Sequence, residues 1–111
     1  MSKLSTITLT GKSKIPYTFN VYPRSDTFKA LGAVYVMSRR TLKPDGTGDH
    51  SFIYIGETGD LSNRPLNHHR KGCFDNNAAN AVLIYVENDA TKRLSIETDL
   101  RGGYSTPCNQ Q

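Results

Sequence analysis

Residues 33–56, AVYVMSRRTLKPDGTGDHSFIYIG, contain two runs of β-branched and aromatic residues on either side of a polar segment. Val, Ile, Tyr and Phe are enriched in β-strands, so we expect one strand at residues 33–38 and a second at residues 51–55. Residues 43–50 contain one proline and two glycines, which is typical of a loop. The connection is short enough for the two strands to pair antiparallel.

The sequence before and after this segment predicts a hairpin and a helix. Residues 7–10 and 15–22 are rich in β-branched and aromatic residues and flank a turn that contains glycine, so they are expected to form a β-hairpin. Residues 60–71 are mostly polar with two spaced leucines, and a helix is expected there that ends at Gly72. Residues 76–80 are small and polar, so a loop should follow.

The last third of the chain predicts one more strand and one more helix. Ala81–Val86 is an apolar run and is expected to be the third strand of the core. Asp89 is placed to cap a helix that runs to about Arg101 and ends at Gly102 and Gly103. Three core strands with one helix between the second and third and another after the third predict an α/β fold, in which helices pack on a small central sheet.

The length of the chain predicts one domain. With 111 residues, we expect a single unit 1–111, in which residues 1–31 form an N-terminal β-hairpin extension and residues 32–111 form the core. No stretch approaches the eighteen or so apolar residues that cross a bilayer, and the first residues do not lead into an apolar signal segment. We therefore expect a soluble, cytoplasmic protein without a membrane partner.

The two cysteines and the net charge limit the kinds of site and partner that the sequence predicts. Cys73 and Cys108 lack the close spacing of a metal-binding pair, and in the cytoplasm they are expected to stay reduced as free thiols. The formal net charge of +4 and the isoelectric point near 9.2 suit a polyanionic partner such as nucleic acid, although many other proteins are equally basic.

An ordered set of short motifs follows the two strands of residues 33–56. It resembles the GIY-YIG nuclease superfamily over roughly residues 32–109, through Ala33-Val34-Tyr35, Tyr54-Ile55-Gly56-Glu57-Thr58, Leu61-x-x-Arg64-x-x-x-His68, Glu97-x-x-Leu100 and Pro107-x-Asn109. The resemblance implies a three-stranded antiparallel sheet flanked by helices and a metal-dependent hydrolysis of nucleic-acid phosphodiesters. Ala33 departs from the family pattern, which has glycine at this position.

The resemblance implies a role for each matched side chain. Tyr35 would hold or deprotonate the attacking water, and Tyr54 would lie against the same phosphate. Arg64 would stabilise charge on the phosphoryl oxygens, and His68 would relay a proton. Without the resemblance, the tyrosines read as strand packing and the other two as part of a solvated basic face. Pro65 disfavours helical geometry at Arg64, so the alternative is a helix that begins at Arg64.

Two downstream residues complete the predicted site. As the matched glutamate, Glu97 would be the only protein carboxylate on a single Mg²⁺ or Mn²⁺ ion, which suits a metal that keeps several waters. Its alternative role is a surface ion pair with Arg93 and Arg101, four residues away on each side. Asn109 would brace the site with its amide, and its alternative role is a cap at the end of a loop.

Together these features predict a small endonuclease of low sequence specificity whose substrate is expected to be DNA. No recognition module fits into the first thirty residues, so specificity would come from a homodimer, a protein partner or DNA structure. The alternatives are an inactive nucleic-acid-binding module and a protein-interaction adaptor on the same fold. Phosphate contacts are expected from five basic residues: Arg39, Arg40, Lys43, Arg70 and Lys71.

Overall fold

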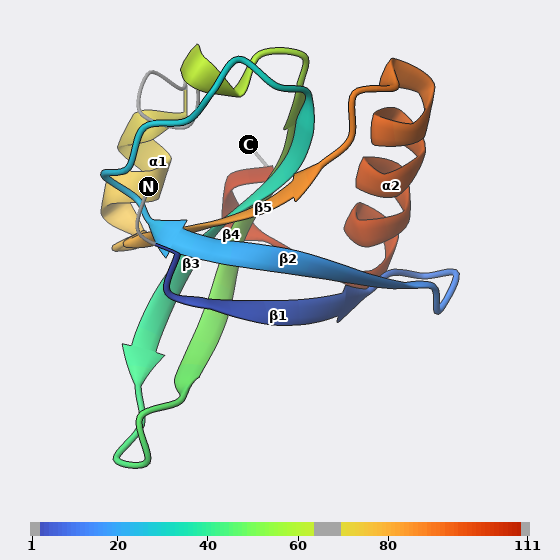
Figure 1. Ribbon diagram of the computed structural model, residues 1–111. Helices are drawn as coiled ribbons and strands as arrows, with labels where there is room; N and C mark the ends of the chain where they lie inside the picture. Colours follow the sequence, from blue (N-terminus) through green and yellow to red (C-terminus); the bar gives the residue numbers. More distant parts are fainter. Residues whose placement is uncertain (1–2, 64–69, 110–111) are drawn as a thin grey trace.

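The computed structural model of the protein describes residues 3–63 and 70–109. Its main feature is a five-stranded sheet with the strand order β1-β2-β5-β3-β4, in which every pair of neighbours is antiparallel. The sheet curls into a half-barrel (Figure 1). The strands are β1 (Ser5–Thr10), β2 (Pro16–Pro23), β3 (Ala33–Leu42), β4 (Gly48–Thr58) and β5 (Ala81–Val86).

The helices are few and short in the described part of the chain. α1 (Lys71–Asn76) has 6 residues and α2 (Ala90–Gly103) has 14, and two 3₁₀ turns, η1 (Leu61–Asn63) and η2 (Pro107–Asn109), complete the set. The prediction of a three-stranded sheet flanked by helices was therefore wrong. The described part of the protein is mostly antiparallel sheet, and within it α2 is the one helix of substantial length.

The N-terminal hairpin accounts for most of this difference. It is part of the central sheet and not an extension, because β2 pairs with β5 from Asn20 opposite Ile84 to Pro23 opposite Ala81. Leu9, Phe19 and Val21 on its inner face are at most 1% exposed. A hairpin with so apolar a face must bury it, and joining the edge of the sheet does so.

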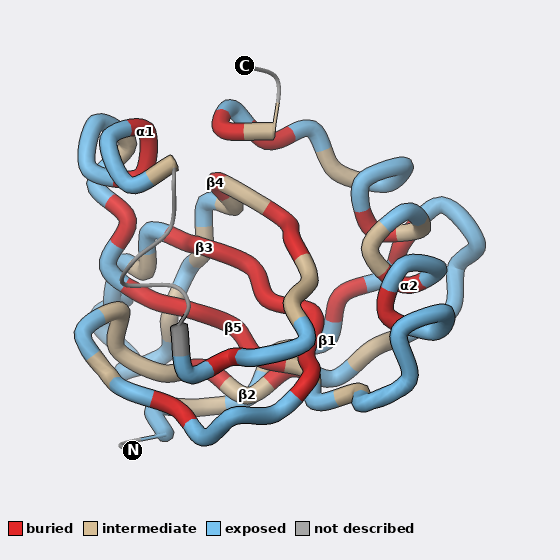
Figure 2. Tube along the Cα trace, turned by 90° about the horizontal axis from the view of Figure 1, so that it is seen from above, coloured by how far each residue is buried: buried red, intermediate tan, exposed pale blue. Residues whose placement is uncertain are grey.

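The alternation of side chains along β3 divides the core between the two faces of the sheet. Ala33, Tyr35 and Met37 belong to one buried cluster, which also contains Phe74 of α1. Val34 and Val36 belong to the other cluster, in which Ile96 and Leu100 of α2 are buried. The two helices therefore cover opposite faces, and buried residues follow β3 and β5 between them (Figure 2).

Several local predictions are confirmed. The third core strand spans Ala81–Val86 as expected. α2 begins after Asp89, whose side chain accepts a hydrogen bond from the backbone N–H of Lys92 at 3.1 Å, and it ends at Gly103. The C-terminal end agrees with the expected glycine stop.

Other boundaries differ from the predictions. β3 continues to Leu42, beyond the expected strand end at residue 38. The loop expected at residues 43–50 is shorter, because β4 already begins at Gly48. Gly72 does not end a helix but lies within α1, which extends into the loop expected at residues 76–80. Of the helix expected at residues 60–71, the segment 64–69 lies outside the described residues.

Cys73 and Cys108 form a disulfide, so the prediction of two free thiols was wrong. The bond joins α1 to η2 across a sequence separation of 35 residues, with the two Cα atoms 5.9 Å apart. Spacing along the chain did not indicate the pair, because only the packing of the C-terminal segment against α1 brings the two sulfurs together.

Membrane spans were sought among the helices of residues 3–63 and 70–109. None of them has the length and apolar character needed to cross a bilayer.

Candidate functional site

The two matched tyrosines meet at Gly56. Tyr35 lies opposite Gly56 in the β3–β4 pairing, and the ring centroids of Tyr35 and Tyr54 are 6.0 Å apart. A Cβ atom at Gly56 would lie 2.9 Å from the Tyr35 Oη and 2.6 Å from the Tyr54 Cε2, so only glycine leaves room for both rings. Tyr54 is partly buried and packs against Phe74, whereas Tyr35 is only 1% exposed.

Replacing Gly56 by alanine should therefore lower the free energy of unfolding by about 1–3 kcal/mol, because both rings must move away from the new methyl group. Gly72 is the matched control: a Cβ there would contact nothing within 4 Å, and the residue lies inside α1. Gly72→Ala should raise the free energy of unfolding by about 0.5–1 kcal/mol. Urea denaturation of both variants measures the two changes. Equal effects would contradict the close contact at Gly56.

Asn109 holds the outer edge of β4 one residue before Gly56. Its side-chain Oδ1 accepts from the backbone N–H of Ile55 at 2.7 Å, and its Nδ2 donates to the backbone C=O of Ile55 at 2.9 Å. The hydroxyl of Thr106 also donates to the Asn109 Oδ1. The side-chain amide thus takes the place of a neighbouring strand. Asn109 lies next to Cys108, so the disulfide holds the same turn in position.

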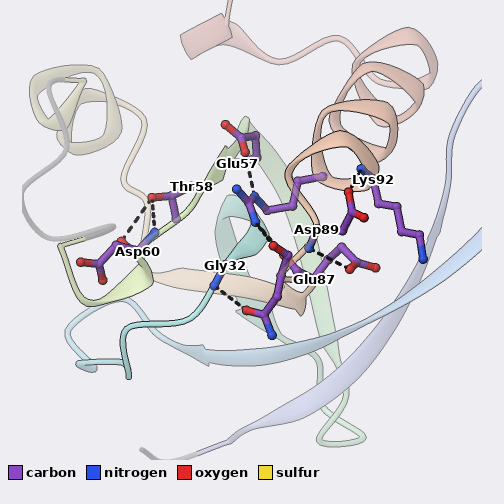
Figure 3. A network of polar contacts seen from close by, with 9 residues as sticks. Gly32, Glu57, Thr58, Asp60, Glu87, Asp89 and Lys92 are labelled. Atoms are coloured by element: carbon purple, nitrogen blue, oxygen red, sulfur yellow. Dashed lines mark hydrogen bonds and ion pairs between the residues drawn. The ribbon is translucent and has the colours of Figure 1, made fainter.

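Glu57 follows Gly56 and leads to a buried arginine. The Nε of Arg93 on α2 donates to the Glu57 carboxylate at 2.9 Å, and Arg93 is only 8% exposed. Figure 3 shows Glu57 near the start of α2, where Asp89 and Lys92 lie. Its Nη1 also donates to the backbone C=O of Glu87 at 3.1 Å and of Asn88 at 2.9 Å. Glu57 is part of the matched Tyr54-Ile55-Gly56-Glu57-Thr58 motif, but no role was predicted for it. Arg93 was predicted as a possible ion-pair partner of Glu97, whereas its partner is Glu57.

Glu97 lies half-buried on α2, four residues after Arg93. Burial raises the pKa of its carboxyl above the ordinary value, the charge of Arg101 opposes that shift and the charge of Glu57 adds to it. A carboxylate destabilised in this way gains from a nearby cation. Within residues 3–63 and 70–109, no three His, Cys, Asp or Glu side chains are grouped to hold a metal. The oxygen chemistry fits a hydrated Mg²⁺.

The predicted site residues fall into two groups on either side of β4. Tyr35 and Tyr54 face the buried cluster that includes α1, and Asn109 lies at the adjacent edge. Glu97 lies on α2, which packs over the opposite face of the sheet. The described residues do not bring Glu97 into contact with the tyrosines. Arg64 and His68 lie outside the described residues.

The predicted phosphate-binding residues lie on two elements that meet at Asn80. Two shallow hollows of about 490 and 370 Å³ share Pro23 and Asn80 in their walls. Arg39 and Arg40 line the first hollow, and Lys71 lines the second together with Arg24, which sequence analysis did not select. Asp75 forms ion pairs with Arg24 at 2.8 Å and with Lys71 at 3.0 Å, which reduces the positive charge there.

The other two basic residues, Lys43 and Arg70, are not among the residues that line these hollows. Lys43 lies in the β3–β4 turn, where it forms an ion pair with Asp49 at 3.2 Å. Arg70 is the half-buried residue before the first turn of α1.

Comparisons of the chain with protein-family models, with curated proteins and with solved structures found no match. The motifs of the sequence and the geometry around Gly56 and Glu97 are therefore the basis for assigning a function.

Proposed function

We propose that the protein is a metal-dependent endonuclease that hydrolyses nucleic-acid phosphodiesters, with DNA as the expected substrate and with low sequence specificity. The observation that carries the proposal is the meeting of β3, β4 and the C-terminal turn η2 around Gly56. Tyr35 and Tyr54 enclose Gly56, and Asn109 fixes the preceding residue, Ile55. These are matched positions of the motif series, and the turn that carries Asn109 brings the last of them from the far end of the chain.

The proposed roles follow from the chemistry of each side chain. The hydroxyl of Tyr54, which is partly buried at the β4 surface, donates a hydrogen bond to a phosphate oxygen. Tyr35 lies beneath it and positions the site. Arg64 neutralises charge on the phosphoryl group through its planar guanidinium, and His68 transfers a proton near neutral pH. The roles of Arg64 and His68 rest on the sequence motif alone.

The proposed metal ligand is Glu97. A divalent cation held there would act as a Lewis acid on a phosphoryl oxygen and would favour ionisation of a bound water. The chain's own contribution is a half-buried carboxylate whose charge is unfavourable without a cation. Glu57 adds negative charge near Glu97 while its own carboxylate is held by Arg93. In this mechanism the Glu97 carboxylate and Tyr54 would have to reach the same phosphate from opposite faces of the sheet.

One observation favours a second candidate function, an inactive nucleic-acid-binding module. Tyr35 is 1% exposed and Glu97 lies over the other face of the sheet, so these two residues do not touch a common ligand as the chain stands. The hollows lined by Arg39, Arg40 and Lys71 would still contact phosphates. Binding of that kind weakens steeply as salt increases and does not need a divalent metal.

Incubation with supercoiled plasmid, branched DNA and single-stranded DNA tests the proposal. Cleavage should require Mg²⁺ or Mn²⁺ and should stop in EDTA. Arg64→Ala and Glu97→Ala should each lose at least about 10²-fold in rate, because the first removes the positive charge that stabilises the phosphoryl oxygens and the second removes the proposed metal ligand. Cleavage that persists in both variants would identify a contaminating nuclease. Salt-sensitive binding without cleavage under any of these conditions would support the inactive module.

A further inference from the structure

The two outer edges of the sheet, β4 and β1, differ in how their outward backbone groups are covered. At β4, the side chain of Asn109 occupies both backbone groups of Ile55, and η2 packs alongside the strand. At β1, the only hydrogen bond to the outer edge from the described ranges 3–63 and 70–109 is made by the Tyr104 hydroxyl, which accepts from the N–H of Thr10 at 3.2 Å. β1 is therefore the edge of the sheet that a further strand can join.

The pairing with β2 shows which backbone groups point outward. Residues in an antiparallel pair alternate between those that bond to the partner and those that point away. Thr10 lies opposite Pro16, which has no N–H, and its own N–H points out to Tyr104. By alternation, Leu9 and Ile7 bond to β2, whereas Thr8 and Thr6 direct their N–H and C=O groups to the outer edge.

The side chains of β1 do not protect this edge. Natural edge strands usually carry charged residues, proline or a bulge that prevents pairing with another chain. The β1 sequence, STITLT, has no charge and no proline, and its residues pair with β2 in unbroken register. Thr6 and Thr8 are exposed, and Ile7 is half-buried on the inner face. A strand with identical properties is available on every other copy of the chain.

We propose that β1 pairs antiparallel with β1 of a second copy, so that the protein forms a symmetric dimer with a continuous sheet. Thr10 limits the register, because its N–H is already bonded to Tyr104. The register that uses only Thr6 and Thr8 places Thr6 opposite Thr8 of the second copy. Four backbone hydrogen bonds then form, and the two Ile7 residues face each other at the two-fold axis.

Cysteine cross-linking tests this register. In a pair that is not hydrogen-bonded the Cα atoms lie about 4.5 Å apart, which suits a disulfide. Ile7→Cys should therefore form a covalent dimer on mild oxidation. Thr8→Cys is the matched control, because its partner would be Thr6 and not another cysteine. The native cysteines are already paired and do not compete. Equal cross-linking of the two variants, or none in Ile7→Cys, would overturn the proposal.

The molar mass in solution gives an independent test. Light scattering should show the mass rising with concentration from 12.3 kDa toward twice that value. Thr8→Pro removes an outward N–H and should remain monomeric, and Thr8→Val keeps that N–H and should dimerise like the wild type. A wild-type chain that stays monomeric up to its solubility limit would overturn the proposal, and so would the finding that β1 binds another protein while the chain stays monomeric. So would a Thr8→Pro variant that is folded by circular dichroism and still dimerises.

Discussion

Replacing Glu97 by glutamine is expected to make the protein more stable at neutral pH and to reduce its cleavage rate by at least about 10²-fold, because even indirect partners of a metal ligand are worth 10–100-fold. The stability gain follows from the raised pKa of the carboxyl, whose main cause is burial. The folded state binds the proton more tightly than the unfolded state. The stability that this group contributes is therefore present below its unfolded pKa and is lost as the pH rises through the folded pKa.

Thermal unfolding of the wild type and Glu97→Gln across acidic to neutral pH measures this effect. The two curves should agree at low pH and separate as Glu97 ionises, with the variant above. The metal provides a readout besides activity: adding Mg²⁺ should lower the pKa of Glu97 in an NMR titration of the carboxyl carbon.

Asp99, two residues further along α2, is the matched control. Its carboxylate accepts hydrogen bonds from the Ser13 N–H at 2.7 Å, the Ser13 hydroxyl at 2.5 Å and the Tyr17 hydroxyl at 2.9 Å. These bonds to Ser13 lower the pKa of Asp99, so it stabilises the fold above its unfolded pKa and loses that contribution in acid. Asp99→Asn should lower stability at neutral pH and leave cleavage unchanged. Effects of the same sign in both variants would contradict the assignment of Glu97.

Removing the disulfide is expected to have the largest effect on stability. The bond closes a loop across 35 residues, and a cross-link of this span is worth about 3–4 kcal/mol in the chain-entropy description. In a domain of this size the midpoint of thermal unfolding should fall by roughly 15 °C or more. The double variant Cys73→Ala/Cys108→Ala, measured by calorimetry beside the wild type with and without reductant, gives the value.

Removing the disulfide should also loosen the candidate site. Cys108 precedes Asn109, whose amide bonds to both backbone groups of Ile55. Without the disulfide, η2 loses its link to α1, and the amide hydrogen of Ile55 should exchange with solvent faster than that of Val36, its neighbour on β3. Reductant should not affect the double variant further. Unchanged exchange at Ile55 would show that Thr106 and local packing are enough to hold Asn109.

Local sequence preferences were sufficient to predict several elements. The apolar run at Ala81–Val86 forms a strand with the expected bounds, and Asp89 caps α2 as its side chain suggested. Such features depend on residues that are close together in the chain, and the local backbone geometry is the same in any fold. The failure at Gly72 has a corresponding cause, since glycine is tolerated inside a helix at a modest cost.

The amino-acid sequence was enough to predict where the strands form and where α2 begins, and the series of motifs that includes Tyr35, Tyr54 and Asn109 stays a prediction. Three features appear only in the folded chain: the hairpin joins β5 in a five-stranded sheet, Cys73 pairs with Cys108, and Arg93 pairs with Glu57. These choices depend on which surfaces are buried together. The partner of a charged or sulfur-containing side chain is the residue that lies beside it in the fold. The two cysteines are 35 residues apart in the sequence, and Arg93 on α2 pairs with Glu57 on β4.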